Sequence, residues 1–250
     1  MRRSHEGPHG DRLFRGLGAA DLLDPGDRDN VGGVHDRSPG EVMNTLDEGA
    51  LRTAHMVASV LLCYPDERLY GERRVLAEAV DGLPEGEVRR RLAAFLEHAE
   101  AAGRVELAAH YVATFDLKRR CCPYLTYYAY GDTRKRGAAL LRFKHALRSA
   151  GFELADGELP DHLAVVCEFL ARGAVRPARR LLTENRAGIE LLRKALEAEA
   201  SPYADVVAAV LAALGPASPR DQEAALRLAA QGPPAEEVGL EPYAVMEASR

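Results

Sequence analysis

From Leu51 onward, apolar residues recur three or four positions apart, which is the spacing that places side chains on one face of an α-helix. Glycine and proline separate one such stripe from the next, and no run alternates with a period of two for long enough to indicate a strand. The sequence therefore predicts an all-α fold, a single multi-helix bundle. The stripes are Leu51, Ala54, Ala58, Leu61 and Leu62; Val88, Leu92, Phe95, Leu96 and Ala99; Ala108, Tyr111, Val112 and Phe115; Leu140, Phe143 and Leu147; Leu163, Val166, Cys167 and Leu170; Ile189, Leu192 and Leu196; and Val207, Val210, Leu211 and Leu214.

The segments that flank this helical region differ from it in composition. Residues 1–48 are rich in Gly, Asp, Arg and His and lack an apolar period, so they are predicted to be a disordered extension. The all-helical domain is assigned to residues 49–215. Residues 216–250 are predicted to contain a linker, a short helix from Ser218-Pro219 to Gln231 and a mobile tail. Met43 lies just before the first helical stripe and is an alternative to Met1 as the natural start.

The overall composition indicates a soluble globular protein. Of its 250 residues, 47% are hydrophobic and 28% are charged, and the formal net charge of −5 argues against a general nucleic-acid binder. An apolar run of the roughly 20 residues that a membrane-spanning helix needs does not occur, so we expect no direct membrane insertion. Arg2-Arg3 is not followed by an apolar segment of the kind found in export signals, and the expected location is the cytoplasm.

The four cysteines do not form a recognisable metal or disulfide motif. They include no CxxC pair, and no histidine lies at zinc-finger spacing from them, so no metal or other cofactor is predicted. Cys121 and Cys122 are adjacent, a spacing that disfavours both a bridge and chelation. We interpret them as buried or partner-facing thiols.

The segment Tyr124–Gly137 is the strongest candidate for a binding site, because it combines four tyrosines, a Gly-Asp turn and three consecutive cations. Tyrosine offers apolar contact area with a polar tip, which suits recognition of a peptide. The alternative is that Tyr124, Tyr127 and Tyr128, at helical spacing, are the inward stripe of a helix. Gly131 is predicted to end one helix, Asp132 or Thr133 to cap the next, and Arg134, Lys135 and Arg136 to lie in its first turn.

The surroundings of this segment are basic. Asp132 is the only acidic residue between positions 118 and 148, which predicts one positive face. Stacking of single-stranded nucleic acid on the tyrosines is a less favoured reading than a groove that binds a peptide. The basic residues are Lys118, Arg119, Arg120, Arg134, Lys135, Arg136, Arg142, Lys144 and Arg148.

A second candidate cluster contains Asp161 and His162, with Glu168 almost two turns further along the same predicted helix. Asp161 could orient the imidazole of His162 as a general base requires. The favoured interpretation is structural, with Asp161 at a positive helix N-terminus and His162 packing or capping. Common enzyme motifs such as GxGxxG, GxxxxGK[ST], HExxH and GxSxG are absent from the sequence.

Several of these motifs together closely resemble the NarJ family, the delta subunits that assemble respiratory nitrate reductase, within the wider TorD-like class. The likeness extends from about Leu51 to Leu214, with a weaker similarity near Glu241-Pro242-Tyr243. The matching segments are Tyr111–Asp116, Arg119–Cys121, Tyr124–Tyr128, Gly131–Gly137, Leu140–Lys144 and Glu158–Leu163. Cys122-Pro123 and residues 1–48 lie outside the family pattern.

The resemblance implies a cytoplasmic, non-catalytic chaperone. Such a protein binds the N-terminal segment of the apo catalytic (alpha) subunit of nitrate reductase and assists insertion of the molybdenum cofactor. The expected state is a monomer or weak homodimer. The alternative function is a helical enzyme or a nucleotide-handling protein that uses Asp161 and His162. The candidate client-binding residues are Tyr124, Tyr127, Tyr128, Asp132, Arg134, Arg136, Asp161, His162 and Glu168.

Overall fold

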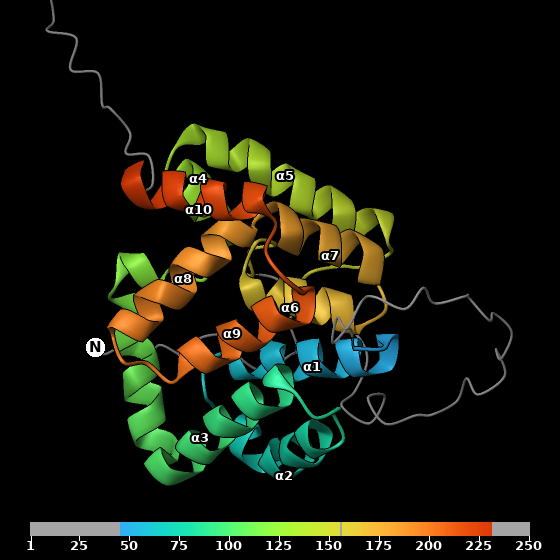
Figure 1. Ribbon diagram of the computed structural model, residues 1–250, viewed down its shortest axis with the longest axis vertical. Helices are drawn as coiled ribbons and strands as arrows, with labels where there is room; N and C mark the ends of the chain where they lie inside the picture. The colour runs from blue at the N-terminus through green and yellow to red at the C-terminus, as the bar shows by residue number, and fades with distance from the viewer. Residues whose placement is uncertain (1–45, 156, 232–250) are drawn as a thin grey trace, which may run out of the picture.

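The computed structural model describes residues 46–155 and 157–231, and within these ranges it contains ten α-helices and no strand (Figure 1). The predicted all-α fold is therefore confirmed. A π-helical turn at Val112–Asp116 and a 3₁₀ turn at Arg119–Cys121 connect α3 to α4. The helices are α1 Glu48–Leu61, α2 Glu67–Asp81, α3 Glu87–Tyr111, α4 Leu125–Tyr130, α5 Arg134–Ser149, α6 Leu163–Ala171, α7 Val175–Glu184, α8 Arg186–Ala198, α9 Tyr203–Leu214 and α10 Pro219–Gln231.

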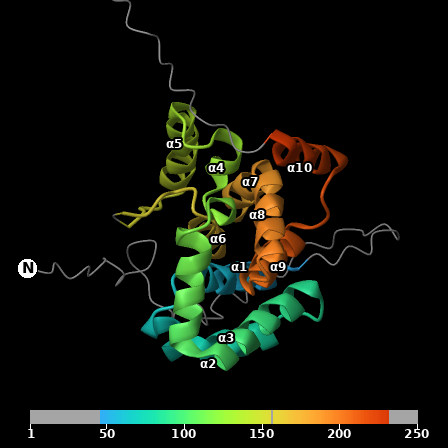
Figure 2. The same cartoon turned by 90° about the vertical axis from the view of Figure 1, so that its left-hand side faces the viewer.

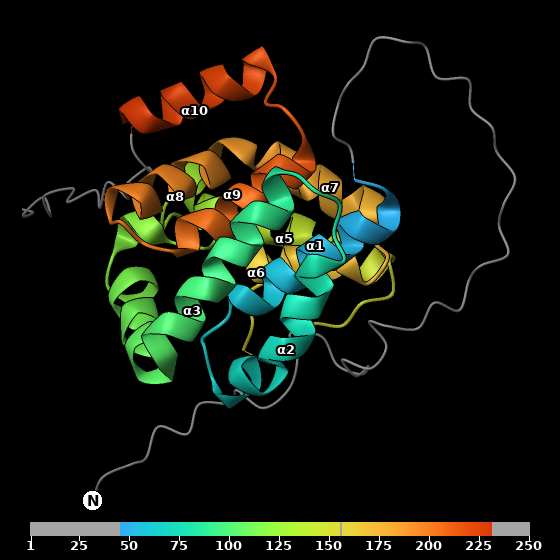
Figure 3. The ribbon, with the colours of Figure 1, turned by 60° about the horizontal axis from the view of Figure 1, so that its bottom comes forward.

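Helices α1, α6 and α9 form the centre of the molecule, with α2 and α3 on one side and α4, α5, α7 and α10 on the other (Figures 1 and 3). α6 packs against α1 and α7, and α9 packs against α1, α3 and α8. All nine residues of α6 are buried. Apart from Glu168, its sequence is apolar on every face, which is typical of a helix at the centre of a core.

A glycine bends the long helix α3. Gly103 has φ 75° and ψ 170°, a backbone conformation that residues with a Cβ atom rarely adopt. The chain therefore bends at Gly103, and Figure 2 shows the two arms of α3 running in different directions. Beyond the kink, the fully buried residue is Leu107, whereas the predicted Ala108 and Val112 are only half-buried. The predicted Tyr111 and Phe115 are buried, so the stripe differs from the prediction by Leu107 in place of Ala108 and by Thr114 in place of Val112.

The inward stripe of α5 also differs from the prediction at one position. Ala139, Phe143 and Leu147 are buried, while Leu140 is half-buried and Leu141 is 65% exposed. Only a narrow face of α5 contacts α4 and α7. Ala139, and not the predicted Leu140, is therefore the residue of α5 that packs against the core at this turn.

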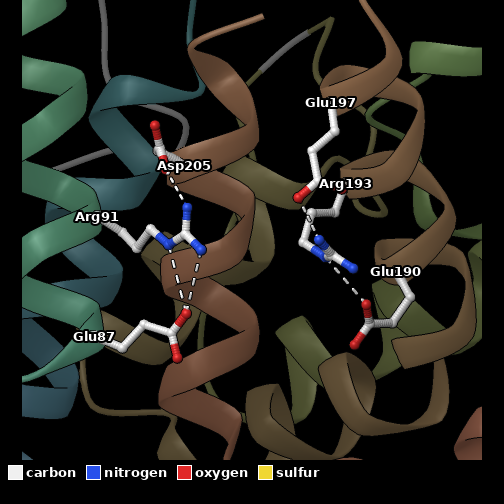
Figure 4. A network of polar contacts seen from close by, with 6 residues as sticks. All are labelled: Glu87, Arg91, Glu190, Arg193, Glu197 and Asp205. Carbon is white, nitrogen blue, oxygen red and sulfur yellow. Dashed lines mark hydrogen bonds and ion pairs between the residues drawn. The ribbon is translucent and has the colours of Figure 1, made fainter. Parts of the chain in front are cut away.

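One group of ion pairs joins α3 to α9, and a second group lies within α8 (Figure 4). Arg91 Nη1 lies 2.7 Å from Asp205 Oδ1 and its Nε lies 3.5 Å from Glu87 Oε1, which ties α3 to the start of α9. On α8, Arg193 pairs with Glu190 at 3.2 Å and with Glu197. Because these groups are partly exposed, each pair contributes at most about 1 kcal/mol.

The helix predicted near the C-terminus is present as α10, which packs against α8 (Figure 3). Residues 1–45 and 232–250, where the disordered extension and the mobile tail are predicted, lie outside the described residues. The division into three segments thus stays a prediction. Among the described helices, none combines the length and the apolar character needed to cross a bilayer.

Candidate functional site

The two motifs predicted as separate clusters meet in the structure. Tyr124 and His162 form an isolated antiparallel bridge, the only pairing of this kind between described residues. The Leu125 N–H donates to Asp161 O at 2.9 Å, and the Leu163 N–H donates to Pro123 O at the same distance. The N-termini of α4 and α6 are therefore held side by side.

Asp161 caps a different helix from the one that was predicted. Its fully buried carboxylate accepts hydrogen bonds from Thr126 N at 3.1 Å and Thr126 Oγ1 at 2.5 Å, in the first turn of α4. Arg136 Nη2 lies 3.8 Å from the same oxygen. The sequence predicts Asp161 at the N-terminus of its own helix; its hydrogen bonds instead go to α4, and His162 is the N-cap of α6. The favourable interaction of an anion with a helix N-terminus is retained.

His162 is the N-cap residue of α6. Its Nδ1 accepts a hydrogen bond from Ala164 N at 3.1 Å, so the ring proton is on Nε2. Burial lowers the pKa of His162 to about 4. The imidazole is accordingly neutral near pH 7, and one of its two nitrogens is already engaged by the backbone.

The ring of Tyr124 contacts both His162 and Arg136. Its ring meets the His162 ring edge to face at 5.1 Å, and the Arg136 guanidinium lies 5.4 Å from its centroid. Tyr124 is half-buried, and its pKa is raised by burial and by the nearby Glu158 carboxylate. Part of the ring is thus accessible to a partner.

Tyr127 and Tyr128 are instead buried, with 8% and 6% exposure. Tyr128 Oη lies 2.9 Å from Cys122 O and 3.1 Å from Arg120 O, and the Tyr128 ring packs against α8 at Gly188. Tyr127 and Tyr128 therefore lie on the inward face of α4, in agreement with the alternative interpretation of the sequence.

The charged rim of the site lies on the turn between α4 and α5. Gly131 ends α4 with φ 55°, and Arg134 begins α5, both as predicted. Thr133 occupies the N-cap position, but its hydroxyl donates to Tyr130 O and makes no cap bond to α5. Asp132 is exposed and lies 3.3 Å from Arg136 and 3.9 Å from Arg119.

Glu168 lies apart from Asp161 and His162. It is buried and forms an ion pair with Arg172 at 2.6 Å. It lies six positions after His162, which corresponds to about 9 Å along the helix axis. The predicted second cluster is therefore divided between the N-terminus of α6 and its second turn.

The sequence interpretation missed Thr126 and Glu199. Thr126 Oγ1 accepts from Arg136 Nε at 3.2 Å and donates to Asp161, so it relays the contact between these two residues. Glu199 follows α8 and pairs with Lys118 and Arg120. A single threonine among tyrosines gives no signal, and the pairs of Glu199 join positions about 80 residues apart.

The adjacent cysteines agree with the buried-thiol interpretation. Cys121 is buried, Cys122 is half-buried, and all four cysteines are free. Burial raises the pKa of the Cys122 thiol to about 11 and also raises that of Cys121. The reactive thiolate is therefore disfavoured at both positions.

Comparison with known proteins identifies the class to which this helical fold and its paired motifs belong. The sequence model of the family described as "Nitrate reductase delta subunit" matches residues 82–209. A Bacillus subtilis protein, the "Probable nitrate reductase molybdenum cofactor assembly chaperone NarJ", is 33% identical over 172 residues, which are 69% of this chain and 92% of that protein. The chain belongs to the nitrate reductase delta subunit family.

Other relatives match a smaller share of their own length. The "Nitrate reductase-like protein NarX" of Mycobacterium tuberculosis is 42% identical over 153 residues, or 61% of this chain, but the match spans only 23% of NarX. The Escherichia coli "Nitrate reductase molybdenum cofactor assembly chaperone NarJ" is 30% identical over 152 residues, 60% of this chain and 64% of that protein. A solved structure of a "Putative Redox Enzyme Maturation Protein" from Archaeoglobus fulgidus has a TM-score of 0.48 and 22% identity, over 70% of this chain and 95% of that one.

Proposed function

We propose that this protein is a non-catalytic assembly chaperone of respiratory nitrate reductase. In this proposal it binds the N-terminal segment of the apo catalytic subunit in the cytoplasm and assists molybdenum cofactor insertion. The observation that carries the proposal is family membership, together with a B. subtilis relative that is named as such a chaperone and is matched over 92% of its length.

The accessible part of the site suits a peptide partner. We define the client surface as Tyr124, Asp132 and Arg134, together with Arg136, whose side chain is 18% exposed and lies 3.3 Å from Asp132. Tyr124 offers apolar area, Asp132 can pair with a basic group, and Arg134, an exposed residue without an ion pair to the described residues, can pair with an acidic one. An amphipathic helix with a basic and an acidic side chain beside its apolar face could contact Tyr124, Asp132 and Arg134 together.

The buried members of the candidate set have a supporting role in this proposal. Asp161 and His162 fix the N-termini of α4 and α6, and Tyr128 fixes α4 against α8. The alternative enzyme function is disfavoured, because Asp161 bonds to Thr126 instead of orienting His162. A histidine whose pKa is about 4 and whose Nδ1 accepts a backbone bond is also a weak base at neutral pH.

Calorimetry with a peptide that copies the N-terminus of the catalytic subunit tests the proposal. We expect 1:1 binding with a negative heat-capacity change, since apolar surface is buried. Arg134→Glu and Asp132→Lys should each weaken binding by about fivefold or more, the cost of an interface residue worth about 1 kcal/mol. Their melting temperatures should stay close to that of the parent protein.

Two control substitutions distinguish residues that contact the peptide from residues that stabilise the fold. Lys144→Glu changes an exposed charge on the same helix, outside the client surface, and should leave affinity nearly unchanged. Asp161→Asn should lower the melting temperature, because it weakens the cap of α4. Equal heats for the peptide and a scrambled version of it would refute the proposal.

A further inference from the structure

A groove between α5 and α7 is not part of the client surface. It has a volume of about 690 Å³ and an apolar floor that includes Ala146, Pro177 and Leu181. Leu141, on its α5 wall, is 65% exposed, so the apolar lining of the groove includes a leucine that is open to solvent. An apolar residue of a partner segment could cover it.

The walls of this groove carry positive charge that the described residues do not neutralise. Arg142, Arg176 and Arg180 line it together with His145, and Glu184 is its one lining carboxylate. Glu184 pairs with Arg180 at 2.7 Å. Among the described residues, Arg176 forms no ion pair and Arg142 bonds only to the hydroxyl of Tyr130.

Helix α5 extends this positive surface. Its sequence, RKRGAALLRFKHALRS, contains six lysines and arginines and no acidic residue. An ordinary exposed helix face carries both signs of charge, which gives the pairs three or four positions apart. The charge and the exposed leucine together favour an acidic segment with apolar residues.

The chain itself contains such a segment directly after α10. Residues 232–250 include Glu236, Glu237, Glu241 and Glu247 against Arg250 alone, a net charge of −3. Apolar residues are interspersed among these glutamates, namely Val238, Leu240, Tyr243, Val245 and Met246. Nineteen residues follow Gln231, and at about 3.3 Å per residue they can span roughly 60 Å. Leu240 and Tyr243, nine and twelve positions after Gln231, can thus lie up to roughly 30 and 40 Å from the end of α10.

We propose that residues 236–247, the acidic C-terminal segment, dock in the groove between α5 and α7 of the same chain. Leu240 and Tyr243 cover the apolar floor and Leu141, while the glutamates pair with Arg142 and Arg176. A tethered segment has an effective concentration of the order of millimolar, so even an intrinsic dissociation constant of about 1 mM leaves it docked roughly half of the time. An external acidic partner would have to displace it.

Tryptophan fluorescence tests the docking on the full chain, which contains no native tryptophan. In Tyr243→Trp the new indole should emit at shorter wavelength than in a free peptide of residues 232–250 that carries the same substitution. Its acrylamide quenching constant should be about twofold lower than that of the free peptide, because the segment is expected to be docked roughly half of the time. Ser249→Trp, outside the docked residues, provides an exposed reference in the same chain.

Charge reversals on α7 locate the site. Arg176→Glu lies in the lining of the groove and should return the emission and quenching of the indole in the Tyr243→Trp chain to the free-peptide values. Arg179→Glu, on the same helix but lining a different hollow, should leave them unchanged. A Tyr243→Trp chain that is quenched as strongly as the free peptide would overturn the proposal. The same holds if Arg179→Glu, and not Arg176→Glu, releases the indole.

Hydrogen exchange of the unsubstituted chain provides a second measurement that does not depend on tryptophan fitting the groove. Amides 238–246 should exchange about twofold more slowly than those of the free peptide, and Arg176→Glu should abolish the difference. Identical exchange in chain and peptide would contradict docking.

Discussion

At the residue scale, His162 connects the site to the solution pH. The neutral imidazole accepts the N-cap bond of α6 through Nδ1, and a protonated ring could not accept it. His55 is the other buried histidine with a pKa lowered to about 4 by burial, and its Nδ1 lies 2.8 Å from Leu51 O. In both cases the folded protein favours the neutral ring, whereas the unfolded chain binds a proton near the ordinary pKa of about 6.5.

We therefore expect the free energy of unfolding to be greatest above pH 6.5 and to fall as the pH is lowered toward 4. The unfolded state binds more protons in this window, and each histidine contributes a loss of the order of 2 kcal/mol between pH 8 and pH 5. His162→Asn keeps a capping side chain but does not titrate. Urea unfolding from pH 5 to 8 should give this variant about 2 kcal/mol less pH dependence than the parent protein.

The matched control is His145→Asn, which replaces an exposed histidine on α5. It should retain the full pH dependence of the parent. If His162→Asn and the parent lose stability in parallel, the neutral cap is not a source of the acid sensitivity.

At the element scale, the crossing of α4 and α8 depends on a glycine. A Cβ atom at Gly188 would lie 3.1 Å from Tyr128 Cβ and Cδ2. Tyr128 cannot shift easily, because its hydroxyl is held at Cys122 O and Arg120 O. The close approach brings α4, and with it Tyr124 and Thr126, to the position where they meet Asp161 and His162.

Gly188→Ala should consequently destabilise the protein by about 1–2 kcal/mol, since the cost of overpacking exceeds the gain in helix propensity. Gly71→Ala is the matched control in α2, where a Cβ atom would meet nothing within 4 Å. That substitution should stabilise the protein by about 0.5–1 kcal/mol. Denaturant unfolding of both variants provides the measurement, and a stabilised Gly188→Ala protein would show that α4 and α8 can move apart at no cost.

At the scale of the whole molecule, burial is distributed unevenly between the centre and the C-terminal helix. Every residue of α6 is buried, whereas Ala225 is the buried residue of α10 among those whose side chains are described. Helices with few buried apolar contacts open locally at a lower free energy than the core.

Native-state hydrogen exchange should accordingly show α6 exchanging only through global unfolding. The amides of α10 should open at a free energy that is lower by at least about 3 kcal/mol, because the local opening exposes little apolar surface. The amides of α9, which lies in the centre with α1 and α6, serve as an internal reference and should behave like those of α6. Equal opening energies for α6 and α10 would mean that α10 is an integral part of the core.

The sequence by itself determined most of the helices, because their signals are local, whereas α2 and α7 fall outside the predicted stripes. The period of Leu51, Ala54 and Ala58 is fixed by the 3.6-residue turn, and the breaks at Gly103 and Gly131 by the freedom of glycine to adopt positive φ. The family followed from motifs in a fixed order along the chain. None of these signals depends on which helix packs against which.

Tertiary structure alone decided the roles of the site residues. Asp161 caps α4 instead of its own helix, because an antiparallel bridge joins chain segments 38 residues apart, at Tyr124 and His162. The folded chain also places Arg136 over Tyr124, whereas Glu168, further along α6, pairs with Arg172. A long-range pairing of this kind leaves no periodic trace in the sequence, since the partner that satisfies a buried carboxylate is chosen by the packing of whole helices.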